Sequence, residues 1–181
     1  MNTMHPDLAR VIISEDDIST RVKELALQIS YDYADEERIY LIGILKGAFI
    51  FMADLCRQLT IPHVVDFMAV SSYGKTATSS GAVRVILDLR DFIENEHVII
   101  VEDIVDTGLT LNYLYHTLKG RNPASLKTCV LSIKDQHDLD VPIDYLGFQI
   151  PNVWVVGYGL DYADTHRTHP FVAELKSDVY K

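Results

Sequence analysis

The residues with the clearest capacity for chemistry lie in one stretch, residues 98–111, which reads VIIVEDIVDTGLTL. Four apolar residues lead directly into two acids, Glu102 and Asp103, and Asp106 follows shortly afterwards. The apolar run predicts a strand that is buried on both faces, as in a parallel sheet, with the acids at its end. The remainder predicts a tight loop that opens a helix, with Thr110 as the N-cap.

A strand, a glycine-containing loop and a helix start together form an anion-binding site, because free backbone N–H groups converge there and the helix dipole favours negative charge. Phosphate alone would be repelled by the acid pair, but ionised carboxylates accept hydrogen bonds from the hydroxyls of a sugar. The segment therefore predicts a phosphorylated sugar, with its diol on Glu102 and Asp103. The non-functional alternative is an ordinary strand-to-helix turn that carries surface acids. The expected phosphate ligands are the amides of Asp106, Thr107, Gly108, Leu109 and Thr110.

Length and composition predict one globular domain over residues 1–181, since 48% of the chain is hydrophobic and 23% is charged. The net charge of −10 argues against non-specific nucleic-acid binding. The sequence shows neither a run of membrane-spanning length nor a secretory signal, so we expect a cytoplasmic protein with no membrane partner. An acidic protein that holds phosphate needs local compensation by amides, a few cations and a divalent metal, which predicts a need for Mg²⁺.

Apolar strands alternate with helices along the chain, which predicts a doubly wound, mainly parallel α/β sheet. Ser14 and Asp17 form a capping box for the first helix. Two regions depart from the alternation, and we interpret them as a flexible hairpin lid at about 72–82 and a small hood formed by the N-terminal residues and about 134–181. Both would cover the carboxyl end of the sheet, where ligands bind in such folds. The predicted strands are residues 39–45, 63–71, 83–89, 98–101, 126–133, 145–148 and 153–156, and the later helices cover 48–59 and end near Lys119. Residues 171–175 close the chain.

Residues 98–111 resemble the binding motif for phosphoribosyl pyrophosphate (PRPP) in type I phosphoribosyltransferases. Other stretches, in the same order, resemble the hypoxanthine(-guanine) phosphoribosyltransferases, and the resemblance runs from about Val11 to Leu175. These stretches are residues 45–47, 72–74, 134, 144–151 and 157–162.

The resemblance implies a purine-salvage enzyme. It would transfer the 5-phosphoribosyl group from PRPP to N9 of hypoxanthine, and of guanine, giving IMP or GMP and pyrophosphate. It further implies Mg²⁺ and a homodimer or homotetramer. Asp106 would be the general acid or base at purine N7. Without the resemblance, Asp106 would be taken for a carboxylate that caps the helix.

Further roles follow from the resemblance. Lys134 would donate to the 6-oxo group of the purine, although alone it would be taken for a surface lysine. Trp154 would stack on the base, and Val155 would offer its backbone to the purine edge. Asp161 would contact the metal near pyrophosphate. The metal ligands, direct or through substrate and water, would be Glu102, Asp103 and Asp161.

Pyrophosphate would lie against Lys46, Gly47 and Arg167, and the family has a non-proline cis peptide at the turn that corresponds to Leu45-Lys46. The lid residues Ser72 and Tyr73 would close over it and exclude water. The chain departs from its relatives at Leu109, where some carry lysine, and at residues 135–140, which are acidic where relatives carry basic residues.

Three alternatives stay open at this point. A phosphoribosyltransferase for xanthine or another base would differ in residues 134–161. A non-catalytic, PRPP-sensing regulator would need a basic nucleic-acid surface, which the charge of −10 opposes. Another nucleotide-binding α/β domain is disfavoured because neither GxxxxGK[ST] nor GxGxxG occurs in the sequence.

Overall fold

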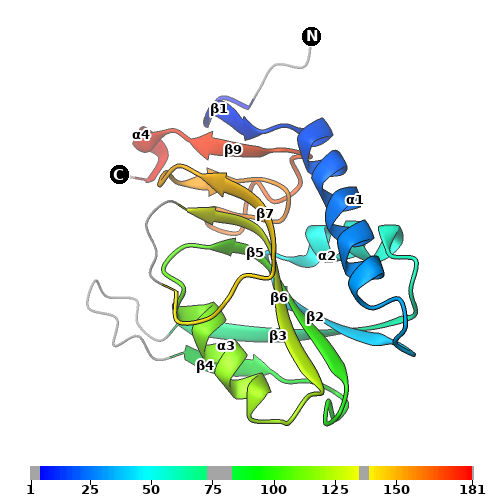
Figure 1. Ribbon diagram of the computed structural model, residues 1–181. Helices are drawn as coiled ribbons and strands as arrows, with labels where there is room; N and C mark the ends of the chain where they lie inside the picture. The colour runs from blue at the N-terminus through cyan, green and yellow to red at the C-terminus, as the bar shows by residue number, and fades with distance from the viewer. Residues whose placement is uncertain (1–4, 73–82, 135–138, 181) are drawn as a thin grey trace.

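The main sheet has six strands in the order β4-β3-β2-β5-β6-β7, seen in Figure 1. Neighbouring strands are parallel except for β3 and β4, which pair antiparallel as the predicted hairpin requires. The computed structural model describes residues 5–72, 83–134 and 139–180. The strands are β2 (Ile39–Leu45), β3 (His63–Ser72), β4 (Val83–Leu87), β5 (His97–Val105), β6 (Ser125–Lys134) and β7 (Tyr145–Ile150).

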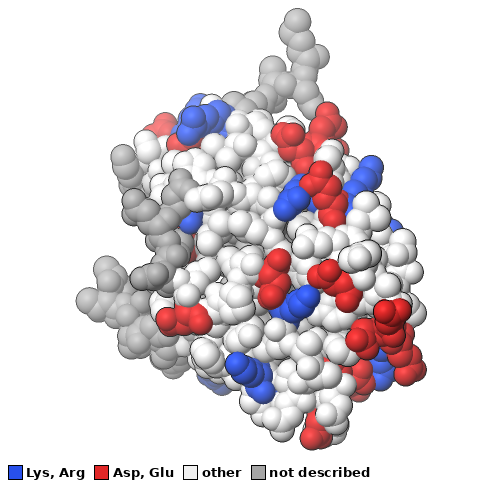
Figure 2. Space-filling model, viewed as in Figure 1, with Lys and Arg blue, Asp and Glu red and all other residues white. Residues whose placement is uncertain are grey.

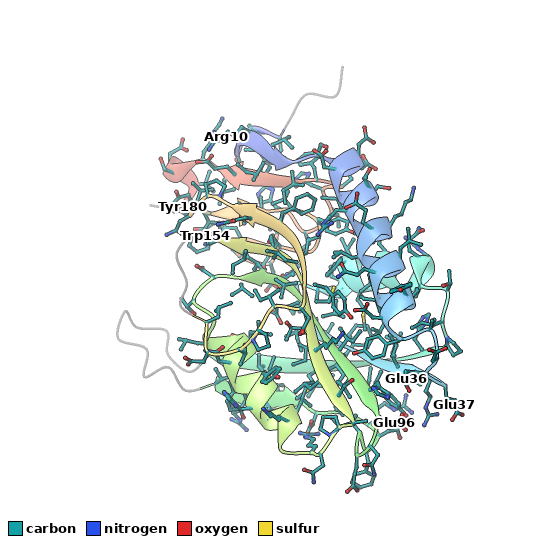
Figure 3. All side chains as sticks on the ribbon, viewed as in Figure 1. Arg10, Glu36, Glu37, Glu96, Trp154 and Tyr180 are labelled. Atoms are coloured by element: carbon teal, nitrogen blue, oxygen red, sulfur yellow. The ribbon has the colours of Figure 1, made fainter. Side chains whose placement is uncertain are left out.

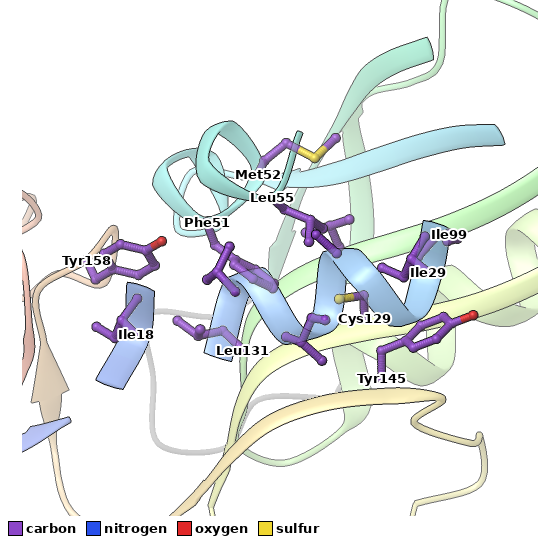
Figure 4. Close-up of a cluster of buried hydrophobic side chains, with 14 of the residues drawn as sticks. Ile18, Ile29, Phe51, Met52, Leu55, Ile99, Cys129, Leu131, Tyr145 and Tyr158 are labelled. Atoms are coloured by element: carbon purple, nitrogen blue, oxygen red, sulfur yellow. The ribbon is translucent and has the colours of Figure 1, made fainter. Parts of the chain in front are cut away.

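Helices cover both faces of this sheet. The helices α1 (Glu15–Asp32) and α2 (Phe49–Gln58) pack on one face, and α3 (Leu109–Lys119) packs on the other. The central strand β5 serves both layers, because Ile99 packs with α1 and α2 while Ile100 packs with α3. Figure 4 shows the first of these two cores. The predicted doubly wound α/β fold is therefore confirmed.

A second, three-stranded antiparallel sheet is built from the two ends of the chain, in the order β1-β9-β8. The strand β1 (Leu8–Ile13) was not predicted, because only its two terminal residues are buried and no apolar alternation marks it. The short helix α4 (Ser177–Tyr180) was also not predicted. The other two strands are β8 (Val155–Val156) and β9 (Val172–Leu175).

Two predictions about this architecture were wrong. The strand expected in the hood, β7, pairs parallel with β6 and so extends the main sheet. Thr110 is not the N-cap of α3, because the helix already begins at Leu109 and Gly108 occupies the cap with φ 76°. A left-handed backbone of this kind suits glycine, which has no Cβ.

The predicted N-cap and apolar stripe of the first helix are confirmed. Ser14 Oγ accepts a hydrogen bond of 3.1 Å from the Asp17 backbone N–H, which satisfies an otherwise free donor of α1. The four-residue stripe of this helix is buried, at Ile18, Val22, Leu25 and Ile29. Among the described helices, none combines the length and the apolar character needed to cross a membrane.

Candidate active site

A cavity of about 580 Å³ lies at the carboxyl ends of the parallel strands. Lys46 follows β2 directly, Asp106 follows β5, and Lys134 is the last residue of β6. Parallel strands end at the same edge of a sheet, so three residues that are far apart in the sequence meet at one site. The other predicted residues that line this cavity are Gly47, Asp103, Trp154, Val155, Asp161 and Arg167.

A smaller hollow of about 90 Å³ adjoins this cavity, and Ile104 and Asp106 line both. It is bounded by Glu102 and by the start of α3, where free backbone N–H groups favour an anion. A Cβ on Gly108 would lie 2.4 Å from Leu139 Cδ2, so a side chain there would also have to displace the end of Leu139. The hollow has the character of a small phosphate-binding site. Thr107 and Thr110 line it as well, whereas the side chain of Leu109 is half-exposed and lines neither space.

The two acids lie inside β5 and not after it, which corrects the predicted end of the strand. The pairing of β5 with β6 continues past them to Val105. Glu102 and Asp103 are buried, with 8% and 7% of their surfaces exposed. Successive residues of a strand point to opposite faces, and accordingly Glu102 lines the small hollow while Asp103 lines the large cavity.

Burial makes both acids electrostatically unusual. Loss of water raises the pKa of Glu102 well above its ordinary value, and the charge of Asp103 adds to this effect. Burial likewise raises the pKa of Asp103 to about 6, although backbone N–H donors and the Arg167 charge oppose the rise. Among the described residues, Glu102 Oε2 has no hydrogen-bond partner. A buried oxygen of this kind needs a donor or a cation, which fits a sugar hydroxyl or a metal ion with its bound water.

The turn after β2 approaches Asp103 closely. The peptide bond between Leu45 and Lys46 is cis, as the resemblance implied. A Cβ on Gly47 would lie 1.5 Å from Asp103 Oδ2, so only glycine fits at this position. The backbone of the turn is thereby brought against a buried carboxylate at the floor of the cavity.

Two cations at the rim are held by a carboxylate that was not predicted. Asp164 Oδ1 lies 2.9 Å from Lys46 Nζ and 3.0 Å from Arg167 Nη2. The hydrogen bonds from Lys46 and Arg167 lower the pKa of Asp164, whose side chain is 72% exposed. Arg167 also pairs with Asp161 Oδ1 at 2.8 Å and donates to the Gly159 carbonyl at 2.8 Å. A dianionic ligand would compete with Asp164 for both cations.

The proposed base-binding residues form a separate group in the same cavity. Lys134 Nζ lies 3.0 Å from Asp106 Oδ2, with side chains 11% and 58% exposed. The ring of Trp154 stacks on Tyr180, with centroids 5.4 Å apart and planes at 27°. Figure 3 labels both residues, at the same end of the molecule. Tyr162 meets Trp154 edge-on at 5.5 Å. Neither tyrosine was predicted, because α4 and the turn at Tyr162 gave no signal of contact with Trp154.

Apolar residues line much of the cavity and were not predicted, since each is an ordinary residue of a strand or loop. They are Leu45, Ala69, Val70, Ile86, Ile104 and Leu160. Of the predicted lid, the structure describes the backbone of Ser72, which pairs with Val83 in β4. The side chain of Ser72 and residues 73–82, which include Tyr73, lie outside the described part of the chain. Residues 135–138 of the acidic stretch are also outside them.

A parallel sheet with two adjoining hollows at its carboxyl end, one of them beside the start of α3, is typical of the class of α/β proteins that bind phosphorylated ligands. Comparison with known families gives the particular member of this class. The model of the phosphoribosyl transferase domain matches residues 14–163, and the chain belongs to this family.

Individual relatives agree over nearly the full length. The hypoxanthine-guanine phosphoribosyltransferase of Dictyostelium discoideum is 48% identical, covering 94% of this chain and 97% of the relative. The enzyme of the same name from Bacillus subtilis is 42% identical, with 98% and 99% covered. A Trypanosoma cruzi hypoxanthine phosphoribosyltransferase, solved in complex with its product IMP, is 46% identical, with a TM-score of 0.90 and with 98% and 100% covered.

Proposed function

We propose that this protein is a purine-salvage enzyme that transfers the 5-phosphoribosyl group from PRPP to N9 of hypoxanthine and of guanine. The products are IMP or GMP and pyrophosphate. Full-length similarity to enzymes with this name supports the proposal, as does the similarity to a structure that contains IMP.

The observation that carries the choice of base is the contact between Lys134 Nζ and Asp106 Oδ2 at 3.0 Å. On a 6-oxopurine, the O6 acceptor and N7 lie next to each other on one edge of the ring system. An ammonium suits O6, and a carboxylate suits a protonated N7. Adenine would present an amino group to Lys134, which sets donor against donor. This pairing therefore favours hypoxanthine and guanine over adenine.

The remaining groups fit the other parts of the reaction. The 5′-phosphate lies on the amides at the start of α3, and Glu102 and Asp103 orient the ribose hydroxyls. N9 forms a bond to C1 of the ribose as the bond from C1 to pyrophosphate breaks, and Asp106 takes the proton from N7. Lys46, Gly47 and Arg167 stabilise the departing pyrophosphate, an electrostatic contribution that is large in reactions of this kind.

Magnesium fits the acids of this site. Members of this family are typically magnesium-dependent. Glu102, Asp103 and Asp161 would hold the ion directly or through substrate and water, because hard cations prefer oxygen ligands. The buried, unpartnered Glu102 Oε2 is the feature of this chain that supports such a ligand. When bound, the ion neutralises charge on the leaving group.

Initial rates with hypoxanthine, guanine, xanthine and adenine test this function, each measured with PRPP and with Mg²⁺ present or chelated. We expect product with the first two bases, at least about a hundredfold less with adenine, and none after chelation. A preference for xanthine would replace the proposed base. PRPP binding without turnover of any base would favour the sensor.

The expected partners are the two substrates and further copies of this chain, and not nucleic acid. On the face drawn in Figure 2, Lys and Arg lie as separate patches among Asp and Glu, so this face presents no continuous basic surface for nucleic acid. Self-association into a homodimer or homotetramer is supported by apolar side chains at the surface, such as Tyr31 at 83% and Phe92 at 95% exposure. Light scattering on the purified chain tests this, and a monomer at micromolar concentration would contradict it.

A further inference from the structure

A second cluster of metal-binding side chains lies where the N-terminal segment meets the loop that follows Asp161. His5 and Asp7 lie just before β1, and His166 belongs to the loop. One possible ligand atom from each of the three side chains lies within 4.8 Å of those from the other two. None of these residues has a part in the transfer reaction proposed above.

The distances match the spacing of ligands around a small tetrahedral ion. Asp7 Oδ2 lies 3.5 Å from His5 Nδ1 and 3.2 Å from His166 Nε2. Zinc–ligand bonds of about 2.0–2.1 Å place neighbouring tetrahedral ligands about 3.3 Å apart. Two imidazoles and one carboxylate are a common donor set for zinc, and they leave the fourth position for water.

The loop holds His166 in a fixed orientation. Its side chain is only 9% exposed, and its backbone is left-handed, with φ 68°. Its ring lies between the edge of His5, with centroids 4.9 Å apart, and the face of His169, at 5.5 Å. His166 Nδ1 is 3.3 Å from His169 Nε2, so the second ring nitrogen has a partner that can fix its tautomer. Such an outer contact is typical of histidines that bind metals.

Lone pairs also converge at the centre of the cluster. The Asp7 backbone N–H donates to His5 Nδ1 at 3.3 Å, so this nitrogen acts as an acceptor in the structure. The Asp7 carboxylate has only lone pairs to offer when it is ionised. A cation between the atoms would relieve the repulsion between these two acceptors and take over the weak contact from the backbone.

We propose that His5, Asp7 and His166 bind one Zn²⁺ ion, with His169 as the supporting contact of His166. The ion joins the N-terminal segment to the loop that presents Arg167 to the active site. Magnesium is a poor occupant, because it prefers oxygen ligands in octahedral geometry. The surrounding hollow, of about 410 Å³, is open enough for an ion and its water to enter.

Metal binding to the full chain, stripped with chelator and then freed of it, tests the site directly. Titration with Zn²⁺ alone should give one ion per chain, and His166→Gln should weaken binding at least tenfold. His5 is exposed, so His5→Ala keeps the fold and should weaken binding to a similar extent. The matched control is His116→Gln on the exposed side of α3, which should bind as the unmodified chain does.

Cobalt gives a second readout that does not depend on affinity. Co²⁺ in a tetrahedral site absorbs strongly in the visible range, and this absorption should appear in the unmodified chain and in His116→Gln but vanish in His5→Ala. The proposal is overturned if the chain binds no Zn²⁺. It is equally overturned if His5→Ala and His166→Gln bind like the control, since the ion would then occupy another site, such as the acids of β5.

Discussion

At the scale of single residues, Asp106 combines exposure with a fixed partner. Its carboxylate is 58% exposed and is held 3.0 Å from Lys134, so it can meet an incoming base without rearrangement of the strand below it. Because the proposed role is proton transfer, the charge of Asp106 matters more than its shape. We expect Asp106→Asn to lower kcat about a hundredfold or more while PRPP binds with nearly unchanged affinity.

The two quantities are measured by steady-state kinetics and by calorimetry with PRPP and Mg²⁺. Asp16→Asn, on the exposed side of α1, is the matched control and should retain both. If kcat of Asp106→Asn stays within twofold of the unmodified enzyme, Asp106 does not transfer the proton.

Asp164 would compete with the substrate, whereas Asp106 would assist it. Asp164 pairs with Lys46 and Arg167, the two cations that pyrophosphate would bind. Removing its carboxylate frees Lys46 and Arg167. We expect Asp164→Ala to bind pyrophosphate about twofold to fivefold more tightly, since exposed ion pairs contribute little each. Calorimetric titration with magnesium pyrophosphate measures the change. Weaker binding would mean that Asp164 positions the cations and does not compete for them.

The difference between these residues explains what the sequence could reveal. Asp106 lies in a motif whose strand, loop and helix start are contiguous, so its surroundings can be inferred locally. Asp164 acts through Lys46, which is 118 positions away in the chain, and Tyr180 supports Trp154 from a terminal turn. Contacts of that kind depend on how the three-stranded sheet packs against the main sheet, and no local sequence pattern predicts that packing.

At the scale of elements, the turn after β2 is built around the absence of one side chain. A Cβ on Gly47 would lie 1.5 Å from Asp103 Oδ2, and Asp103 is held inside a strand paired on both sides. We expect Gly47→Ala to lower the free energy of unfolding by about 1–3 kcal/mol and to abolish most turnover. Urea denaturation and initial rates measure the two effects.

Gly120, at the end of α3, is the matched control for this substitution. Its φ is −66°, and the nearest atom to an added Cβ would be 3.5 Å away, an ordinary contact. Gly120→Ala should therefore keep both stability and turnover. Equal effects of the two substitutions would show that the contact with Asp103 is not what requires glycine at position 47.

Elements were predictable where a single segment carries its own signal. The capping box at Ser14 and the apolar runs of β2 and β6 placed their elements to within one or two residues. The acids of β5 looked like the end of the strand, because charge usually marks exposure, whereas here pairing with β6 continues past them. The strand β1 escaped prediction because its partner, β9, comes from the other end of the chain.

At the scale of the whole molecule, a chain with a net charge of −10 buries two of its acids, Glu102 and Asp103, at the candidate active site. The pKa of Asp103 is about 6 in the folded protein against 3.8 ordinarily, and burial is the main cause. The folded state therefore holds this proton more tightly than the unfolded chain. The stabilisation is complete below about pH 4 and is lost as pH rises to 6 and above. The buried charge thus destabilises the enzyme at the pH where the proposed contacts with metal and ribose would use it.

Asp103→Asn should remove this cost, because an amide keeps the shape and stays neutral. Near pH 7.5, without ligands, we expect the variant to exceed the unmodified chain in free energy of unfolding by about 1–3 kcal/mol. The difference should shrink as pH falls toward 4, where Asp103 is protonated, and turnover of the variant should be low at every pH. Urea denaturation at several pH values measures it. A variant that is less stable than the unmodified chain at pH 7.5 would mean that the charge of Asp103 is compensated within the fold, by Arg167 and the donors of β5, and does not wait for a substrate.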